Sequence, residues 1–253
     1  MTVAAKPTKL GTAEFIAQCR DVLIPVPGTT LAYFSAIPLD TPDQDHLIND
    51  PITAFPPGLS TIIPNLRLVY VPYLELTEPA SKDAPNVVIS FQQPPQEIRR
   101  LSAFETVGEE AYLFISAGFG EDTDIHDVLF GALAQQIVSS SNAAFVAPFH
   151  KLVATELRNR VHGEVGDIAW DLKKSLLGLQ SDEQKRSDLL KSYLNQALRD
   201  TVALYLHGLC CDIDLRANPK QLASKYIRKR LLVIKDHLPP PEGVGLFPSD
   251  LPG

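Results

Sequence analysis

The sequence contains few cysteines, no long apolar run and no recognisable catalytic motif. Its three cysteines are too few for a disulfide framework, and two of them, Cys210 and Cys211, are adjacent, a spacing that strains a disulfide ring. No stretch approaches the roughly 18 apolar residues of a membrane span, and the first residues lack the apolar segment of a signal peptide. These features favour a soluble protein in a reducing cytoplasm.

Motifs that would name a reaction are also missing. The chain has no serine elbow, Walker loop, zinc knuckle or kinase signature. Since active sites can also assemble from scattered residues, catalysis is left open.

The composition indicates a chain that buries a full core. Of its 253 residues, 45% are hydrophobic and 21% are charged, and the formal net charge at pH 7 is -7. These proportions are typical of globular proteins and do not predict a low-complexity disordered chain. The negative net charge disfavours general binding to nucleic acid, although a local basic segment keeps a restricted form of it open.

Proline is concentrated in the first 100 residues, which contain 14 of the 21 prolines. Since proline disrupts helices and central strands, this part favours short strands and fixed loops. Pro72 indicates a sheet edge or a bulge. Residues 40–60, rich in proline and polar turn formers, predict an ordered surface loop. Four segments rich in β-branched and aromatic residues predict strands: 29–37, 66–76, 86–91 and 110–117.

After Asp124 the spacing of apolar residues becomes helical. The pattern predicts one helix over residues 125–139 and a second, long helix from Pro148 to Leu176. A capping box at Ser181 and the Asn-Pro pair at 218–219 predict the starts of two more.

The order of these elements predicts an α+β fold. A proline-rich N-terminal sheet, mixed or antiparallel, precedes an antiparallel helical bundle. We expect a sheet domain over residues 1–140 and a helical domain over residues 141–253, or a single fused unit.

Positive and negative charges are separated along the chain. Between Arg100 and Lys151 all seven charged residues are acidic, whereas Arg216 to Lys235 holds seven basic residues and no acid. Opposed charged segments favour a specific protein partner or contact between copies of the chain. We therefore expect a protein partner or a homo-oligomer.

The acidic loop at 121–127 is the candidate metal site. Asp122, Asp124 and Asp127 offer carboxylate oxygens, which a divalent cation prefers as ligands. The loop lacks the central glycine of an EF-hand, and acids also gather at helix N-termini because the helix dipole favours them. A divalent cation serving a metal-dependent hydrolase and simple helix capping both stay open.

Two other clusters favour structural roles. Glu156, Arg160 and Glu164 stand four residues apart, as solvated ion pairs on a helix do. The apolar surroundings of Cys210 and Cys211 predict reduced, mostly buried thiols rather than catalytic ones.

The helix expected at 219–237 is basic on one side and apolar on the other. Arg230 falls among the apolar residues, so it should extend to solvent or meet a carboxylate. Such a helix can bind an acidic protein, a phosphate backbone or an anionic lipid surface. No Trp or Phe separates its basic residues as a stacking platform for single-stranded nucleic acid. The candidate interaction residues are Lys225, Arg228, Lys229 and Lys235.

The leading hypothesis is a non-catalytic protein-interaction or scaffold protein of the cytoplasm. The alternatives are a metal-dependent hydrolase that uses the 121–127 loop, and a binder of anionic surfaces, nucleic acid or lipid headgroups, through the helix at 219–237.

Overall fold

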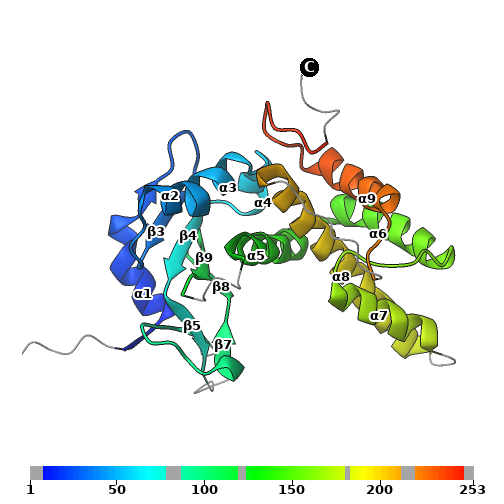
Figure 1. Ribbon diagram of the computed structural model, residues 1–253, viewed down its shortest axis with the longest axis horizontal. Helices are drawn as coiled ribbons and strands as arrows, with labels where there is room; N and C mark the ends of the chain where they lie inside the picture. The colour runs from blue at the N-terminus through cyan, green and yellow to red at the C-terminus, as the bar shows by residue number, and fades with distance from the viewer. Residues whose placement is uncertain (1–7, 78–86, 119–123, 180–182, 212–219, 248–253) are drawn as a thin grey trace, which may run out of the picture. The chain divides into compact units, whose positions relative to one another are not determined.

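The computed structural model describes residues 8–77, 87–118, 124–179, 183–211 and 220–247 (Figure 1). The fold is α+β, as the sequence predicts: two sheets are built from residues before 117, and helices dominate from Ile125 onward. The chain divides into two compact units, which are considered separately below. Unit 1 comprises residues 1–49 and 63–132, and unit 2 comprises residues 50–62 and 133–253. The expected domain limit at residue 140 stays a prediction.

Unit 1 contains a five-stranded mixed sheet. Its three inner strands are parallel, and the two outer strands pair antiparallel to their neighbours. At its centre Val69 lies opposite both Phe34 and Phe114. The strands in spatial order are β2 (Ile24–Pro25), β3 (Ala32–Ser35), β4 (Leu66–Val71), β9 (Glu110–Ser116) and β8 (Ser102–Val107).

A second sheet in unit 1 is antiparallel throughout. Pro72 ends β4, and the chain continues into this second sheet rather than along one strand over 66–76. The physical reason is that proline has no N–H to donate to the ladder. The strands in spatial order are β1 (Lys9–Gly11), β6 (Val87–Ser90), β5 (Tyr73–Leu76) and β7 (Arg99–Arg100).

Aromatic side chains join the first helix to the mixed sheet. On α1 (Thr12–Cys19), Phe15 meets Phe34 and Phe114 edge to face, with ring centroids 5.9 and 6.2 Å apart. Tyr70 donates a hydrogen bond to the Leu47 carbonyl. Short 3-10 turns follow α1 at η1 (Arg20–Val22) and precede β7 at η3 (Gln96–Ile98).

The prediction of a loop over residues 40–60 is wrong, because most of this segment is helical. Asp40 caps the first helix by accepting from the Asp43 N–H at 2.9 Å, and Pro42 occupies a first-turn position, where its missing N–H costs no hydrogen bond. Ile48 and Ile52 are buried. The elements are α2 (Thr41–Gln44), the π-helix η2 (Asp45–Asn49), α3 (Asp50–Thr53) and α4 (Leu59–Ile62).

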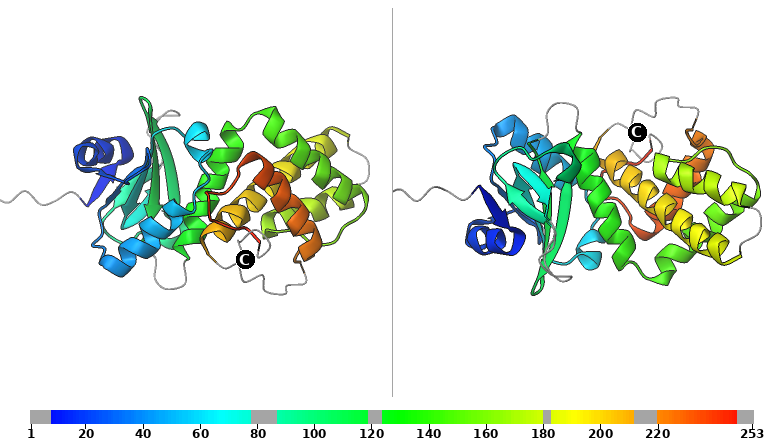
Figure 2. Two further views of the ribbon diagram at one scale, coloured as in Figure 1. Left: turned by 90° about the horizontal axis from the view of Figure 1, so that it is seen from above. Right: turned by 90° about the horizontal axis from the view of Figure 1, so that it is seen from below.

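Unit 2 is built around its longest helix. The division between the units falls within α5 (Ile125–Ser140), and α8 (Glu183–Cys210) packs against α6, α7 and α9 (Figure 2). Ser181, where the capping box begins, lies outside the described residues. The other helices are α6 (Ala143–Arg158), α7 (Asp167–Gly178) and α9 (Ser224–His237).

The single long helix predicted from Pro148 to Leu176 is instead two helices. α6 ends at Arg158, and the chain turns through Arg160 and Gly163, whose φ angles are +52° and +84°. A Cβ on Gly163 would lie 2.3 Å from the backbone oxygen of Gln221. Glycine is therefore required by both the backbone conformation and the close contact.

Candidate functional site

Three predicted interaction residues lie on the solvent-facing side of α9. Lys225, Arg228 and Lys229 are exposed, whereas Lys235 is half-buried. Leu232 follows Arg228 by four residues and Lys229 by three, which puts it on the same side of the helix, and it is 39% exposed. We call these four residues, Lys225, Arg228, Lys229 and Leu232, the α9 basic face.

One of the basic residues, Lys225, stands where the helix dipole disfavours a positive charge. Lys225 is in the first turn, no acidic residue accompanies it there, and Ala223 at the N-cap supplies no side-chain hydrogen bond. A positive charge at a helix N-terminus is unfavourable by roughly 0.3–1 kcal/mol. The position of Lys225 is therefore not explained by the stability of α9.

Aromatic rings support the basic side chains. The Lys225 and Lys229 ammonium groups lie 5.0 and 5.8 Å from the centroid of the Tyr226 ring, and the Arg228 guanidinium lies 4.0 Å from the Phe247 ring. Across the described part of the chain, neither lysine forms an ion pair. Their charges are thus open to an external carboxylate or phosphate.

The opposite side of α9 is held in place by a buried ionic cluster. Arg230 is fully buried and contacts Glu156 through Nη2 at 2.7 Å and Nε at 2.9 Å. Its Nη1 lies 2.7 Å from Glu164, which also accepts from Lys173 at 2.8 Å and from the Tyr193 hydroxyl. Of the two outcomes expected for Arg230, extension to solvent or contact with a carboxylate, the structure shows the second.

The prediction of solvated ion pairs among Glu156, Arg160 and Glu164 is wrong. Both glutamates are buried and pair with Arg230. Four-residue spacing brings side chains together only within a continuous helix, and α6 ends before Arg160. The cluster instead joins α6, the 159–166 turn, α7, α8 and α9.

The electrostatics of the cluster favour fixed ionisation. Burial by itself would raise the pKa of Glu164, but the hydrogen bonds and charges of Arg230 and Lys173 outweigh it and lower that pKa. Burial and the adjacent Glu164 carboxylate raise the pKa of Tyr193. With Glu164 held ionised, Tyr193 held protonated and the Lys173 and Arg230 side chains shielded from solvent, the cluster suits a structural role rather than proton transfer to a substrate.

Asp200 on α8 differs from Glu164, because the pKa of its carboxyl is raised rather than lowered. Its Oδ1 accepts from Gln196 at 2.7 Å, whereas its Oδ2 is buried without a hydrogen-bond partner in the described residues. Burial raises the pKa of this carboxyl to about 6. Gly166 lies beside it, since a Cβ there would be 2.4 Å from Oδ2.

One of the acidic residues between Arg100 and Lys151, the acidic segment, already has basic partners within unit 1. Glu110 pairs with Arg20 at 2.9 Å and with Arg67 at 3.1 Å, and it accepts from the Tyr112 hydroxyl at 2.9 Å. Both arginines precede the acidic segment in sequence, so counting charges along the chain overstated its free negative charge.

The described metal candidates lie at the start of α5. Asp124 Oδ1 accepts from the backbone N–H of His126 at 2.8 Å and of Asp127 at 3.4 Å, as a capping carboxylate does. Asp124 and Asp127 are both exposed, and Asp122 lies outside the described residues. A divalent cation at these three residues stays a prediction.

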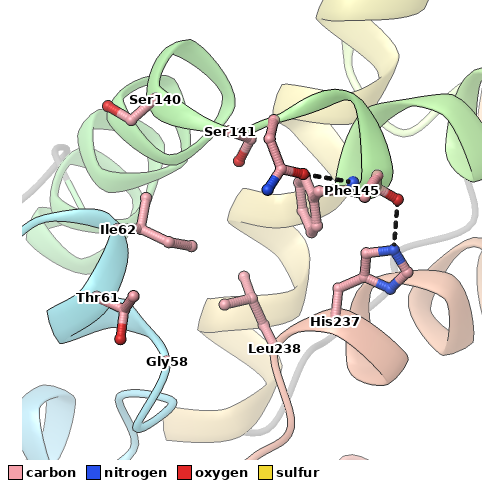
Figure 3. A pocket seen from close by; sticks show the side chains of 10 residues that line it. Gly58, Thr61, Ile62, Ser140, Ser141, Phe145, His237 and Leu238 are labelled. Carbon is pink, nitrogen blue, oxygen red and sulfur yellow. Dashed lines mark hydrogen bonds between the residues drawn. The ribbon is translucent and has the colours of Figure 1, made fainter.

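A cleft of about 520 Å³ lies within unit 2 (Figure 3). Residues of α4, of the junction between α5 and α6 and of the end of α9 line it, and the Nε2 of His237 donates to the Ala144 carbonyl at 2.8 Å. Among the described residues, no carboxylate, lysine or arginine lines the cleft, so none of them offers His237 a charged partner there for acid–base chemistry.

The chain matches no protein-family model, no curated protein and no solved structure. Among the described residues, no helix combines the length and apolar character needed to cross a membrane. Two further residues take part in this site. The position of Leu232 on the basic side of α9 can be found from the helical spacing, whereas the contact of Phe247 with Arg228 has no signal in the sequence.

Proposed function

We propose that this chain is a non-catalytic interaction protein of the cytoplasm that binds an acidic segment of a protein partner through the α9 basic face. The observation that carries the proposal is the group of exposed cations, Lys225, Arg228 and Lys229, on the same side of α9 as the exposed Leu232. A partner that neutralises Lys225 accounts for a cation kept where the helix dipole opposes it.

A protein segment fits this face better than a nucleic acid. The exposed leucine among the charges suits a partner with both carboxylates and an apolar side chain. The net charge of -7 opposes approach to a polyanion, whereas a short acidic segment needs only local attraction.

A separate partner also fits better than a second copy of this chain. Self-association through opposed charges would use the acidic segment of unit 1, in which Glu110 is already paired with two arginines. Association between copies is therefore an outcome for the test to detect, and it would replace the proposed partner.

The test reverses Lys225, Arg228 and Lys229 together to glutamate. The probe is a synthetic peptide rich in glutamate and aspartate with one central leucine, and its affinity is measured by titration at several salt concentrations. We expect the reversal to weaken binding by about tenfold to a hundredfold, because exposed ion pairs contribute up to roughly 1 kcal/mol each. Added salt should weaken binding of the wild type.

A matched control variant changes the net charge by the same amount at a different place on the chain. Lys151, Arg186 and Lys191 are exposed residues of α6 and α8, and reversing all three should leave peptide binding close to wild type at physiological salt. Because glutamate near the start of α9 suits the helix dipole, the α9 triple variant should unfold at the same or a higher denaturant concentration than the wild type.

Other outcomes would overturn the proposal. An equal loss of peptide affinity in both triple variants would mean that the peptide binds by general charge attraction. Tight binding of duplex DNA or anionic vesicles without peptide binding would favour the anionic-surface alternative. A mass that falls in light scattering on reversal would indicate self-association. Lost stability without a change in mass would indicate that the face contacts acids of its own chain.

A further inference from the structure

The adjacent cysteine thiols at the end of α8 are a second candidate site, separate from the α9 basic face. Cys210 is the last residue of α8 and Cys211 follows it, and their Sγ atoms lie 3.2 Å apart. Both are reduced and half-buried, in agreement with the sequence prediction of reduced, mostly buried thiols. The third cysteine, Cys19, is buried in unit 1, and burial raises its pKa to about 11. The pair therefore holds the more accessible thiols of this chain.

The geometry favours a reversible bond between these sulfurs rather than a permanent one. A disulfide needs its sulfurs at about 2.05 Å, so they must close by roughly 1 Å. The Cα atoms of adjacent residues are about 3.8 Å apart, below the separation of about 4.4 Å at which ordinary disulfides begin. The resulting strain makes such a disulfide easy to reduce, which is the property of regulatory disulfides.

The position at the helix end makes the strain tolerable. The Cys211 N–H donates to the His207 carbonyl at 2.8 Å, beyond the last helical residue. Distortion of the 210–211 peptide therefore disturbs the last turn of α8 and leaves its interior hydrogen bonds in place.

We propose that Cys210 and Cys211 form a redox site that is oxidised to a vicinal disulfide by a small-molecule disulfide of the glutathione type. One cysteine thiolate attacks the oxidant, forms a mixed disulfide and releases one thiolate. The second cysteine thiolate attacks the cysteine sulfur of that mixed disulfide and releases the other thiolate. The protein loses two protons and two electrons, and the oxidant leaves as two thiols.

The test incubates the full chain in mixtures of reduced and oxidised glutathione. Remaining thiols are then alkylated, and the peptide that contains residues 210 and 211 is mapped by mass spectrometry. We expect a product that lacks two hydrogens and retains no glutathione, formed as oxidised glutathione rises and reversed by reduced glutathione. Hydrogen exchange at the Cys211 amide should become faster in the oxidised protein.

Single substitutions supply the controls. Cys210→Ser and Cys211→Ser should each stop at the mixed disulfide with glutathione, whereas Cys19→Ser should leave the reaction unchanged. A stable glutathione adduct on the wild type, a disulfide between two chains, or unreacted thiols under oxidising conditions would each overturn the proposal. These readouts are made on the wild type, so they stand even where a serine variant fails to fold.

Discussion

Replacing Arg230 by methionine tests the buried cluster that orients the α9 basic face. The substitution keeps an apolar stem of similar length and removes the guanidinium that contacts both Glu156 and Glu164. Glu164 keeps Lys173 and the Tyr193 hydroxyl as partners. Within the described residues, Glu156 keeps no partner, because Arg230 alone contacts its Oε2 and its Oε1 already lacks one.

The expected cost follows from that unpaired carboxylate. Removing one partner of a buried ion pair leaves a buried charge uncompensated and costs about 3–5 kcal/mol. Replacing the charged Glu156 side chain by a neutral one should recover part of the lost stability. The double variant Arg230→Met, Glu156→Gln should therefore be more stable than Arg230→Met alone. Coupling between groups in direct contact is typically about 0.5–3 kcal/mol.

Arg228→Met provides the matched control on the same helix. Arg228 is exposed and stacks on Phe247 at 4.0 Å, a contact worth up to about 1 kcal/mol at an exposed site. Arg228→Met should therefore cost much less stability than Arg230→Met, although the two residues are only two positions apart.

Denaturant unfolding followed by tryptophan fluorescence is the suitable assay. Trp170, the single tryptophan, lies on α7 in unit 2 with its ring 4.9 Å from that of His162, so its emission reports on unit 2 rather than unit 1. This matters because the two units need not unfold together. An Arg230→Met variant within about 1 kcal/mol of the wild type, or no less stable than Arg228→Met, would refute the reasoning.

Two further predictions concern the same unit. Because burial raises the pKa of Asp200 to about 6, the folded state binds this proton more tightly than the unfolded state, and the contribution of Asp200 to stability should fall as pH rises from about 4 to about 6. Asp200→Asn removes this loss, so the unfolding free energy at pH 7 relative to that at pH 4 should be about 1–3 kcal/mol higher in the variant than in the wild type; an identical pH profile in both proteins would contradict the burial of that carboxyl. Gly163→Ala should lower the free energy of unfolding by more than about 1 kcal/mol, because its Cβ would meet the Gln221 backbone and its φ is +84°. Gly178→Ala, with open space around the new Cβ, is the control for that change, and equal unfolding midpoints for the two variants would count against the turn.

Local patterns in the sequence determined the fold class and many of its elements. The strands at β3, β4, β6 and β9 and the helix α5 follow from spacing and β-branched content, which act between near neighbours. The helical wheel likewise placed Lys225, Arg228 and Lys229 on the solvent side and Arg230 among the apolar residues, where it had to reach solvent or meet a carboxylate. Each of these features depends on residues within a few positions of one another.

Only the tertiary structure decided which distant groups meet. The partners of Arg230 are 74 and 66 residues away, and the arginines that neutralise Glu110 come from outside its segment. Pro72 shows the same limit, since its missing N–H predicts an interruption but not that β4 and β5 join different sheets. The turn at Gly163 is enforced by contact with Gln221, which lies 58 positions further along the chain. Such contacts depend on long-range packing, which leaves no periodic pattern in the sequence.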